Sequence, residues 1–291
     1  MPWHFTDEVE AYAERTWDLL AARPAENTIA LTVIESVRAG HGRYSKPMLF
    51  GWYDTDRVTG AVSMTPPYGL LLAAVPDHAV DELVAALRAS AVSVPGVSGD
   101  TATADRFAAA WTAGGRLRAT TTMRTQLYIL GTLRPPVPPP PGRSRLARRG
   151  DFETAVDWFR KFQTESGALA VDAELVVRDR LENGLLWLWE DDAGAVVSLA
   201  ARSRTAAGVA RIGPVYTPPE HRRRGYGAAV TAACTRDALE HDADHVVLFT
   251  DLANPTSNAI YQEIGYQPVL EQKIVNFEAS KEERDLATLG R

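Results

Sequence analysis

The most informative stretch of this sequence is residues 215–228, which read Val215-Tyr216-Thr217-Pro218-Pro219-Glu220-His221-Arg222-Arg223-Arg224-Gly225-Tyr226-Gly227-Ala228. A strand-like run ends at two prolines, and a loop that contains glycine then enters an alanine-rich helix. The first main-chain N–H groups of a helix have no partners within the helix, and they lie at the positive end of its dipole. This order of strand, loop and helix therefore predicts a site for an anion such as a pyrophosphate.

The residues of the loop support this prediction. Gly225 and Gly227 leave the main chain open to a ligand because they have no Cβ, and Arg222–Arg224 attract phosphates. The common nucleotide-binding patterns Gly-x-x-x-x-Gly-Lys-Ser/Thr and Gly-x-Gly-x-x-Gly are both absent from this junction. The simpler alternative is a helix start whose glycines ease packing and whose arginines are solvated.

A proline-rich segment divides the chain. Residues 135–142 read Pro135-Pro136-Val137-Pro138-Pro139-Pro140-Pro141-Gly142 and hold six of the 18 prolines. Because proline lacks a main-chain donor and restricts φ, a stiff extended linker is predicted, with a ligand for a proline-binding partner as the alternative. The predicted domains are residues 1–134 and residues 143–291, on either side of the linker at 135–142.

Hydrophobic periodicity predicts the same order of elements in both halves. In the first half we expect a helix that Asp7 caps and that ends near Pro24, a helix at Thr28–Arg38, strands at Met48–Tyr53, Gly60–Thr65 and Leu70–Val75, a helix at Ala79–Ala89, a short strand near Val92–Val97, a helix at Thr103–Thr112 and strands within Arg116–Leu130. In the second half we expect a strand at Leu146, helices that begin at Asp151 and Asp172, strands at Leu185–Trp189, Ala195–Ala201 and Ala210–Tyr216, a helix at Gly225–His241, a strand at His245–Thr250, a helix at Pro255–Ile264 and strands at Gln267–Gln272 and Lys273–Phe277. The hairpins at 51–64 and 188–199 also resemble each other, so we interpret the halves as a divergent duplication, with chance similarity as the alternative.

Composition narrows the class of protein. The 291 residues include 31 Lys and Arg against 37 Asp and Glu, which gives a net charge of −6 and no support for a nucleic-acid partner. No apolar run approaches the about 20 residues of a membrane span, and the N-terminus lacks the features of a secretory signal. The single cysteine, Cys234, excludes a cysteine-rich metal site and is expected to pack in a helix. We expect a soluble, cytoplasmic protein with no membrane, nucleic-acid or metal partner.

Two motifs in the second half resemble a known family. Arg222-Arg223-Arg224-Gly225-Tyr226-Gly227 fits the Gln/Arg-x-x-Gly-x-Gly/Ala signature of the GNAT superfamily of acyl-CoA-dependent N-acyltransferases. Downstream, Asn254 is followed seven residues later by Tyr261 and then by the pair Gly265-Tyr266, which is similar to a second family feature. The resemblance covers about residues 143–278. It implies an α/β fold of two GNAT-like domains in tandem, each with a mixed, mostly antiparallel sheet flanked by helices.

The resemblance also implies where acetyl-CoA binds. In such enzymes two parallel strands separate, and the pantetheine arm inserts between them. Main-chain groups of Val215 and Thr217 would contact the arm, the amides of Arg223–Ala228 would surround the pyrophosphate, and Asn254 and Asn258 would line the arm. The full set of expected cofactor-binding residues is Val215, Tyr216, Thr217, Arg222, Arg223, Arg224, Gly225, Tyr226, Gly227, Ala228, Asn254 and Asn258.

The implied reaction is direct attack of an amine on the thioester, which needs an acid for the departing thiolate. Tyr261 occupies the position where the family often places that acid, and packing beneath the cofactor is its alternative role. The general base is not identifiable, because the strand at 210–215 carries no carboxylate. Glu190, Asp191, Asp251 and His221 are candidates by residue type alone, and a water chain or an amine that arrives neutral is the alternative.

The first half lacks the features of the cofactor loop. Its equivalent turn, residues 74–83, contains Asp77, Asp81 and Glu82 and no glycine, so it would repel a pyrophosphate. We interpret it as a degenerate GNAT-like domain, with an α/β domain of different topology as the alternative.

The expected function is acetyl-CoA-dependent N-acetyl transfer to a primary amine of a small molecule or peptide. The alternatives are a non-catalytic acyl-CoA-binding sensor or assembly module and a protein that binds another anion at the arginine triplet. The sequence leaves open the identity of the amine, the length of the acyl group and the oligomeric state.

Overall fold

The computed structural model describes residues 2–40, 47–167 and 171–280. The first half of the chain has the order β1 (Trp3–Thr6), α1 (Val9–Ala21), α2 (Thr28–Arg38), β2 (Leu49–Asp54), β3 (Val58–Met64), β4 (Leu70–Ala74), α3 (Val80–Ala89), β5 (Gly96–Asp100), α4 (Thr101–Thr112) and β6 (Leu117–Leu130). The second half has the order β7 (Arg143–Leu146), α5 (Phe152–Ser166), α6 (Ala173–Glu182), β8 (Leu186–Glu190), β9 (Val196–Arg202), β10 (Val209–Tyr216), α7 (Tyr226–His241), β11 (His245–Asp251), α8 (Pro255–Glu263) and β12 (Tyr266–Ala279). Single 3-10 turns precede α3, α5 and α7 at η1 (Asp77–Ala79), η2 (Arg149–Asp151) and η3 (Pro219–His221).

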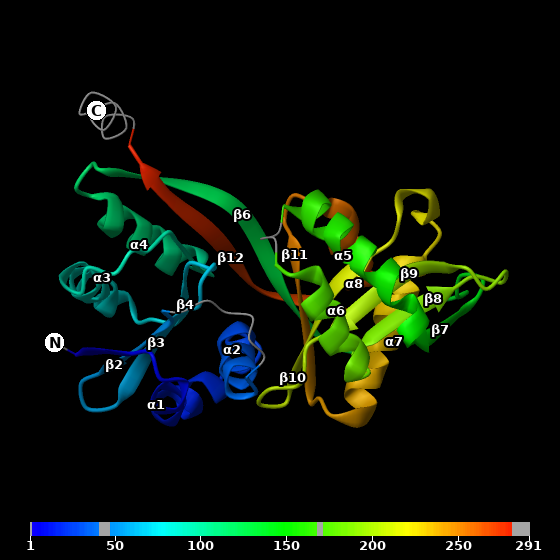
Figure 1. The fold of residues 1–291 in the computed structure, drawn as a ribbon, viewed down its shortest axis with the longest axis horizontal. Helices are drawn as coiled ribbons and strands as arrows, with labels where there is room; N and C mark the ends of the chain where they lie inside the picture. Colours follow the sequence, from blue (N-terminus) through cyan, green and yellow to red (C-terminus); the bar gives the residue numbers. More distant parts are fainter. Residues whose placement is uncertain (1, 41–46, 168–170, 281–291) are drawn as a thin grey trace. The chain divides into compact units, whose positions relative to one another are not determined.

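The second half repeats the strand pairing of the first (Figure 1). In each half the first four strands pair antiparallel with their neighbours in chain order, and the fourth pairs parallel with the fifth. The hairpins β2–β3 and β8–β9 share a register shift at the same place, next to Tyr53 and Trp189. The predicted common order of elements and the predicted α/β fold with a mixed, mostly antiparallel sheet are confirmed.

The structure divides into two compact units. Each of the two longest strands, β6 and β12, has one part in each unit. Unit 1 comprises Met1–Thr125 and Leu270–Arg291, and unit 2 comprises Gln126–Val269. In unit 1 the neighbour of β5 is the second part of β12, and in unit 2 the neighbour of β11 is the second part of β6. In each unit, the strand next to the fifth strand therefore comes from the other half of the sequence.

This exchange explains where the observed elements differ from the expected ones. The compact units end at residues 125 and 269, not at the proline-rich segment. The prediction of two final strands was wrong, because β12 continues through Gln272 and Lys273 to pair with β5. Residues 117–130 likewise form one strand. Two further differences are separate from the exchange: the pattern missed β1, and the N-cap position of α1 is Glu8 rather than Asp7, with no cap hydrogen bond from its side chain.

The sheet of unit 2 lies between two layers of helices (Figure 1). The helices α5 and α6 cover one face, where Trp158 and Val177 pack with Leu199. The helix α7 covers the opposite face, where Val230 packs with Ala200. Side chains of a strand alternate between the two faces of a sheet, so consecutive residues of β9 enter different cores. The loop before α7 is thereby held at the carboxyl end of β10.

The end of the proline-rich segment is fixed to unit 2. Residues 135–142 form neither helix nor strand, as predicted. However, Trp189 Nε1 donates a hydrogen bond to the carbonyl oxygen of Pro141 (2.9 Å), and Pro140 is buried. Gly142 has a φ of +102°, and a Cβ at this position would lie 1.9 Å from the Glu190 carbonyl oxygen. The last residues of the segment are therefore packed, not a free spacer.

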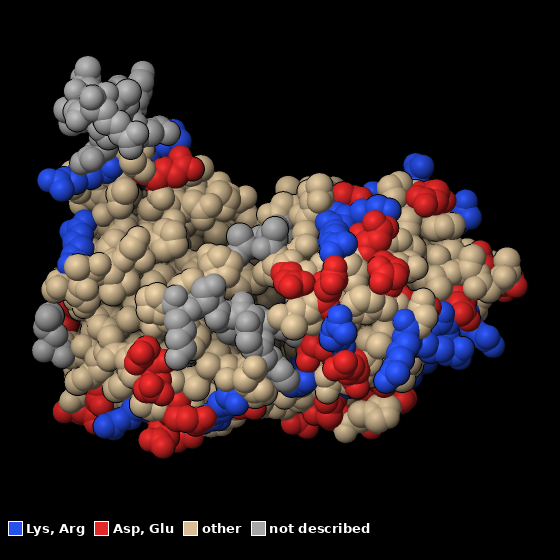
Figure 2. Space-filling view, viewed as in Figure 1, with Lys and Arg blue, Asp and Glu red and all other residues tan. Residues whose placement is uncertain are grey.

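Basic and acidic side chains are interspersed over the face of unit 2 in Figure 2. Several ion pairs of this unit join such neighbours, including Arg160 with Glu174 (2.8 Å) and Lys161 with Asp157 (2.7 Å). Both pairs are more than half exposed, so each contributes little to stability. Across residues 2–40, 47–167 and 171–280, no helix has the length and apolar character needed to cross a membrane.

Replacing Gly265 by alanine is expected to destabilise the protein by about 2 kcal/mol. Gly265 has a φ of +106°, and a Cβ there would lie 1.9 Å from the carbonyl oxygen of Thr132. Its own carbonyl accepts a hydrogen bond from the Gly131 N–H (3.0 Å), so the main chain is held in place. Urea unfolding measures the effect, and Gly194→Ala, which also has a positive φ but no atom within 4 Å of a new Cβ, is the matched control. Equal stabilities of the two variants would contradict the role of this close approach.

Candidate functional site

The strands β10 and β11 separate at their carboxyl ends. They pair in parallel from Val209 opposite His245 to Ile212 opposite Leu248. Beyond these residues β10 continues to Tyr216 and β11 to Asp251, and no further pair joins them in the part of the chain that the structure describes. The register of β10 against β9 also shifts between Ile212 and Val215. The main chain around Val215 therefore borders a gap in the parallel pairing, as the resemblance implied.

The loop that follows β10 forms a cradle of main-chain donors. Arg223 and Gly225 both have positive φ values, of 60° and 81°. The first main-chain hydrogen bond of α7 is donated by the Ala229 N–H to the Gly225 carbonyl oxygen (3.0 Å). Among the described residues, no group accepts a hydrogen bond from the six main-chain N–H groups of residues 223–228. A series of free N–H groups at a helix start, with positive φ values within it, has the chemistry that can bind an anion.

Thr217 holds the start of this loop against the sheet and the helix. Its Oγ1 lies 2.8 Å from the hydroxyl of the buried Ser198 on β9, and that hydroxyl also donates to the Tyr216 carbonyl oxygen (3.1 Å). A Cβ on Gly227 would lie 3.3 Å from Thr217 Oγ1. The absence of a side chain at Gly227 therefore lets the first turn of α7 approach the end of β10.

Arg222 has partners within the protein. Its Nε donates to the Thr217 carbonyl oxygen (2.9 Å), its guanidinium pairs with Glu165 Oε2 of α5 (2.5 Å), and it lies 5.8 Å from the centre of the Tyr216 ring. Only Arg223 and Arg224 of the predicted cationic triplet are exposed and without an ion pair in the described ranges. Arg222 therefore braces the loop, and its charge is largely offset by Glu165.

Glu165, the ion-pair partner of Arg222, also binds Tyr216. The Tyr216 hydroxyl donates to Glu165 Oε1 (2.8 Å). Partial burial alone would raise the pKa of Glu165, but the hydrogen bonds from Arg222 and Tyr216 outweigh it and hold the pKa below its ordinary value. Burial, together with the carboxylate of Glu165, raises the pKa of Tyr216 to about 12. Glu165 is thus an ionised partner of Arg222 and not a candidate proton acceptor at neutral pH.

The two asparagines of the second motif hold the turn between β11 and α8. Asn254 is the N-cap of α8, and its Oδ1 accepts a hydrogen bond from the Ser257 N–H (3.0 Å). The Nδ2 of Asn258 donates to the carbonyl oxygens of Asp251 (2.9 Å) and Asn254 (2.8 Å). These bonds explain why asparagine suits both positions, since its amide satisfies main-chain groups in turns. Contact of either residue with pantetheine stays a prediction.

Tyr261 projects from α8 against the core of unit 2. Its ring packs edge-on against Tyr266, with 6.3 Å between the ring centres. Although part of the residue is exposed, burial of the phenol raises the pKa of Tyr261 to about 12. No described residue forms a hydrogen bond with its hydroxyl. The phenol is therefore protonated at neutral pH and available to donate a proton.

The candidate bases have other partners or lie in turns. Glu190 pairs with Arg145 (2.5 Å), which holds the pKa of Glu190 below its ordinary value, and Asp191 accepts two main-chain N–H groups of the hairpin turn. Asp251 accepts the Ala253 N–H (2.8 Å) at the end of β11. His221 keeps a buried Nδ1 that has no hydrogen-bond partner in the described ranges. No carboxylate on β10 replaces them.

Unit 1 differs from unit 2 at the positions that correspond to the candidate loop and to Tyr261. Its helix α3 begins with acidic residues, of which Asp81 pairs with Arg106 (2.8 Å) and Glu82 accepts a hydrogen bond from Tyr53 (3.3 Å). The residue seven positions after the N-cap of α4 is the buried Phe107, whereas the residue seven positions after the N-cap of α8 is Tyr261. Unit 1 thus has neither the basic loop nor the phenol.

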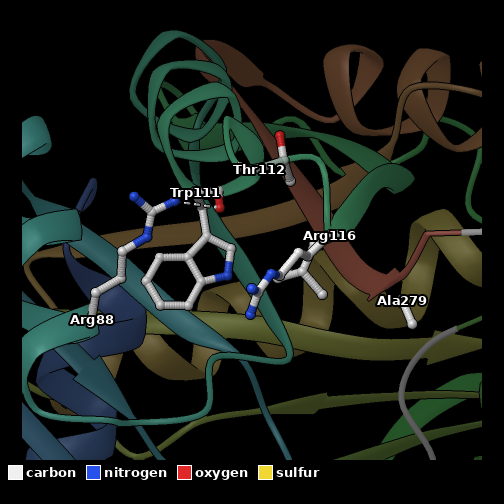
Figure 3. A pocket seen from close by; sticks show the side chains of 7 residues that line it. Arg88, Trp111, Thr112, Arg116 and Ala279 are labelled. Atoms are coloured by element: carbon white, nitrogen blue, oxygen red, sulfur yellow. Dashed lines mark hydrogen bonds between the residues drawn. The ribbon is translucent and has the colours of Figure 1, made fainter. Parts of the chain in front are cut away.

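A cavity of about 510 Å³ lies in unit 1, away from these positions in the sequence (Figure 3). Arg88 and Trp111 line it, and Arg88 donates hydrogen bonds to the carbonyl oxygens of Ala110 (3.0 Å) and Trp111 (2.9 Å). A cation that binds the last carbonyls of a helix stabilises the helix end. Arg88 therefore has a structural role at the end of α4. None of the predicted site residues lines this cavity.

Comparisons with known proteins agree with this geometry. Residues 192–275 match the family model of FR47-like proteins. A Drosophila protein aligns with a TM-score of 0.66 and 15% identity over 95% of this chain and 98% of that chain. A GCN5-related N-acetyltransferase from Sphaerobacter thermophilus aligns with a TM-score of 0.63 and 13% identity over 96% of both chains. A tandem GNAT protein from the clavulanic acid biosynthesis pathway aligns with a TM-score of 0.54 and 13% identity over 95% of this chain and 98% of that chain.

These identities are low, so the likeness to solved structures shows the fold. The aligned regions span nearly the whole chain, which confirms the predicted tandem arrangement of two GNAT-like halves. The matched family segment includes the loop at 222–228 and Tyr261, which confirms the resemblance inferred from the two motifs. None of the curated proteins matches the chain by sequence.

Proposed function

Because this chain has a tandem GNAT fold whose second half matches the FR47-like family, we propose that it is an acetyl-CoA-dependent N-acetyltransferase. Unit 2 would bind acetyl-CoA and transfer the acetyl group to a primary amine of a small molecule or peptide. Unit 1 would have no cofactor of its own, because acidic residues replace the basic loop and Phe107 stands where unit 2 has Tyr261.

One observation carries this proposal: six consecutive main-chain N–H groups, of residues 223–228, have no acceptor among the described residues. The first N–H groups of any helix lack a partner within the helix, and here the N–H groups of the three exposed residues before α7 extend that series. The donors lie at the positive end of α7, beside Arg223 and Arg224. A diphosphate has the charge and the number of oxygens that such a cradle binds.

The proposed roles of the residues follow from their positions. The main chain of residues 223–228 would hold the diphosphate, with Arg222 and Glu165 bracing the loop. Main-chain groups of Val215 and Thr217 would orient the pantetheine beside the gap between β10 and β11. Acetyl-CoA would supply the activated acyl group as a thioester. Tyr261 would donate its proton to the departing sulfur, because its phenol is held neutral.

A non-catalytic acyl-CoA-binding module is the second candidate. The observation that favours it is the lack of a general base, because Glu190 and Asp191 are engaged elsewhere and β10 carries no carboxylate. An amine that reaches the site in its neutral form needs no such base. Both candidates therefore predict binding of acetyl-CoA, but only the acetyltransferase predicts turnover.

Two measurements separate these candidates. Titration calorimetry with acetyl-CoA tests binding, and release of free coenzyme A with a panel of primary amines tests transfer. The proposal predicts binding together with release that depends on an added amine. Binding without release for every amine would favour the second candidate. Absence of binding would contradict both.

A further inference from the structure

The strands β12 and β6 each contribute a side chain that binds a helix of the unit they enter. This helix is α4, after β5, in unit 1 and α8, after β11, in unit 2. In unit 1, Lys273 of β12 is buried and its Nζ donates to the carboxylate of Asp105 on α4. In unit 2, Tyr128 of β6 is 3% exposed, and its hydroxyl bonds to α8. The helix α8 carries Tyr261. The first half of the sequence therefore supplies a direct contact to the element that holds the proposed acid.

The contact of Tyr128 with α8 involves two residues of that helix. The Tyr128 hydroxyl donates to Asn258 Oδ1 (3.1 Å) and accepts a hydrogen bond from Gln262 Nε2 (3.0 Å). Residues four apart lie on the same side of a helix, and Tyr261, three residues after Asn258, lies beside them. The hydroxyl of Tyr128 thus uses both its donor and its acceptor capacity to fix the side of α8 next to Tyr261.

The contact extends to the end of β11. The Nδ2 of Asn258 donates to the carbonyl oxygens of Asp251 and Asn254. The Asn258 side chain therefore connects the Tyr128 hydroxyl, through hydrogen bonds, with the turn between β11 and α8. The rings of Tyr128 and Tyr261 both pack in the core that includes Tyr266 and Ile264. Without the Tyr128 hydroxyl, Asn258 Oδ1 and Gln262 Nε2 each lose the hydrogen-bond partner that they have among the described residues. The helix α8 then keeps its cap, the bonds of Asn258 Nδ2 and its apolar contacts, but it loses both hydrogen bonds to β6.

We propose that Tyr128, on the strand that the first half of the sequence donates, is the positioning residue for Tyr261. The inference rests on the proposed function for the role of Tyr261, but its structural content is independent of activity. It assigns the degenerate first half a role in the reaction: its last strand completes unit 2 and orients the acid there.

Tyr128→Phe in the full chain tests this inference. The variant keeps the ring and removes two hydrogen bonds, so the main-chain amides of α8 from Tyr261 to Glu263 are expected to exchange with deuterium about tenfold faster. Exchange in α7 is expected to stay unchanged. The matched control is Tyr53→Phe, which removes a buried hydroxyl from unit 1, where it donates to Glu82 (3.3 Å). Wild-type exchange of α8 in Tyr128→Phe would overturn the inference.

Kinetics provide the second measurement. Tyr128→Phe is expected to lower kcat about tenfold and to change the KM for acetyl-CoA much less, because the diphosphate cradle lies on a different helix from Asn258. In a Tyr261→Phe background the same substitution is expected to have no further effect on kcat, because the residue acts through Tyr261. An equal loss in both backgrounds would contradict positioning. A wild-type protein without turnover would refute the proposed function, and the exchange measurement would still decide the role of Tyr128.

Discussion

Replacing Gly225 by glutamate is expected to weaken the binding of acetyl-CoA about 1000-fold. Gly225 is exposed in the middle of the cradle, with a φ of 81°. A carboxylate there lies within several ångströms of the expected diphosphate, and two like charges about 5 Å apart near a protein surface repel by about 3 kcal/mol. The left-handed conformation adds about 1 kcal/mol of strain for a residue other than glycine. Titration calorimetry measures the loss of affinity.

The control separates charge from conformation. Gly225→Gln has the same size and the same strain as the glutamate variant and lacks its charge, so we expect its binding to weaken only about tenfold. Both new side chains would have room, because the nearest atoms to a Cβ at this position are those of Pro140, 3.7–4.0 Å away. Equal affinities of the glutamate and glutamine variants, in two folded proteins of equal thermal stability, would mean that no diphosphate lies at Gly225.

Replacing Tyr261 by phenylalanine is expected to lower kcat about 100-fold with little change in the dissociation constant of acetyl-CoA. General acid catalysis contributes about 10²–10⁴-fold to a rate, and a thiolate with a pKa of about 8.5 is an adequate leaving group, so we expect the lower limit. The ring stays in the core beside Tyr266, so the fold is retained. Steady-state release of coenzyme A measures kcat, and calorimetry measures affinity. A variant with full turnover would remove Tyr261 from the mechanism.

The pH dependence of turnover gives an independent check on the same residue. Burial raises the pKa of Tyr261 to about 12, so the phenol remains protonated on the acidic side of that value. A group that must donate a proton loses activity only as the pH rises through its pKa. Turnover is therefore expected to rise as the amine substrate loses its proton and to show no fall below about pH 11. A fall in turnover near pH 8 that is absent from Tyr261→Phe would mean that the phenol loses its proton near pH 8. That result would contradict the raised pKa of Tyr261.

The conformation of the loop between β10 and α7 was predictable because its determinants are local. The residues from Val215 to Ala228 contain the strand end, the two prolines, the glycines and the helix start in one continuous stretch. Each of these residue types has a conformational preference that acts over a few positions. The positive φ of Gly225 and the close approach of Gly227 to Thr217 are what that pattern indicates. The free donors of residues 223–228 follow from the same local conformation.

The exchange of β6 and β12 was not predictable from periodicity. Alternation of apolar and polar residues indicates a strand but not its partner, and a strand of 14 residues has the same pattern as two shorter ones. The pattern therefore carries no signal for the contacts of Lys273 and Tyr128. Their partners, Asp105 and Asn258, lie 168 and 130 residues away in the sequence. Nothing local indicates such a pairing.

The sequence analysis also missed the ion pair between Arg222 and Glu165. The sequence pattern indicates three equivalent arginines before Gly225, but Glu165, 57 residues earlier, pairs with the first of them. Glu165 lies near the C-terminal end of a helix that was correctly predicted. Its partner depends on how that helix packs on β10, through Trp158 against Tyr216. A tertiary contact of this kind is set by packing, which residue types alone do not specify.

A crystal structure of the full chain with coenzyme A is the most direct measurement of the central claim, that free main-chain donors hold a diphosphate. The account predicts diphosphate oxygens within about 3.2 Å of main-chain nitrogens between Arg223 and Ala228, with the pantetheine beside Val215. A coenzyme bound elsewhere, or a cradle whose N–H groups are bonded to other parts of the protein, would contradict it.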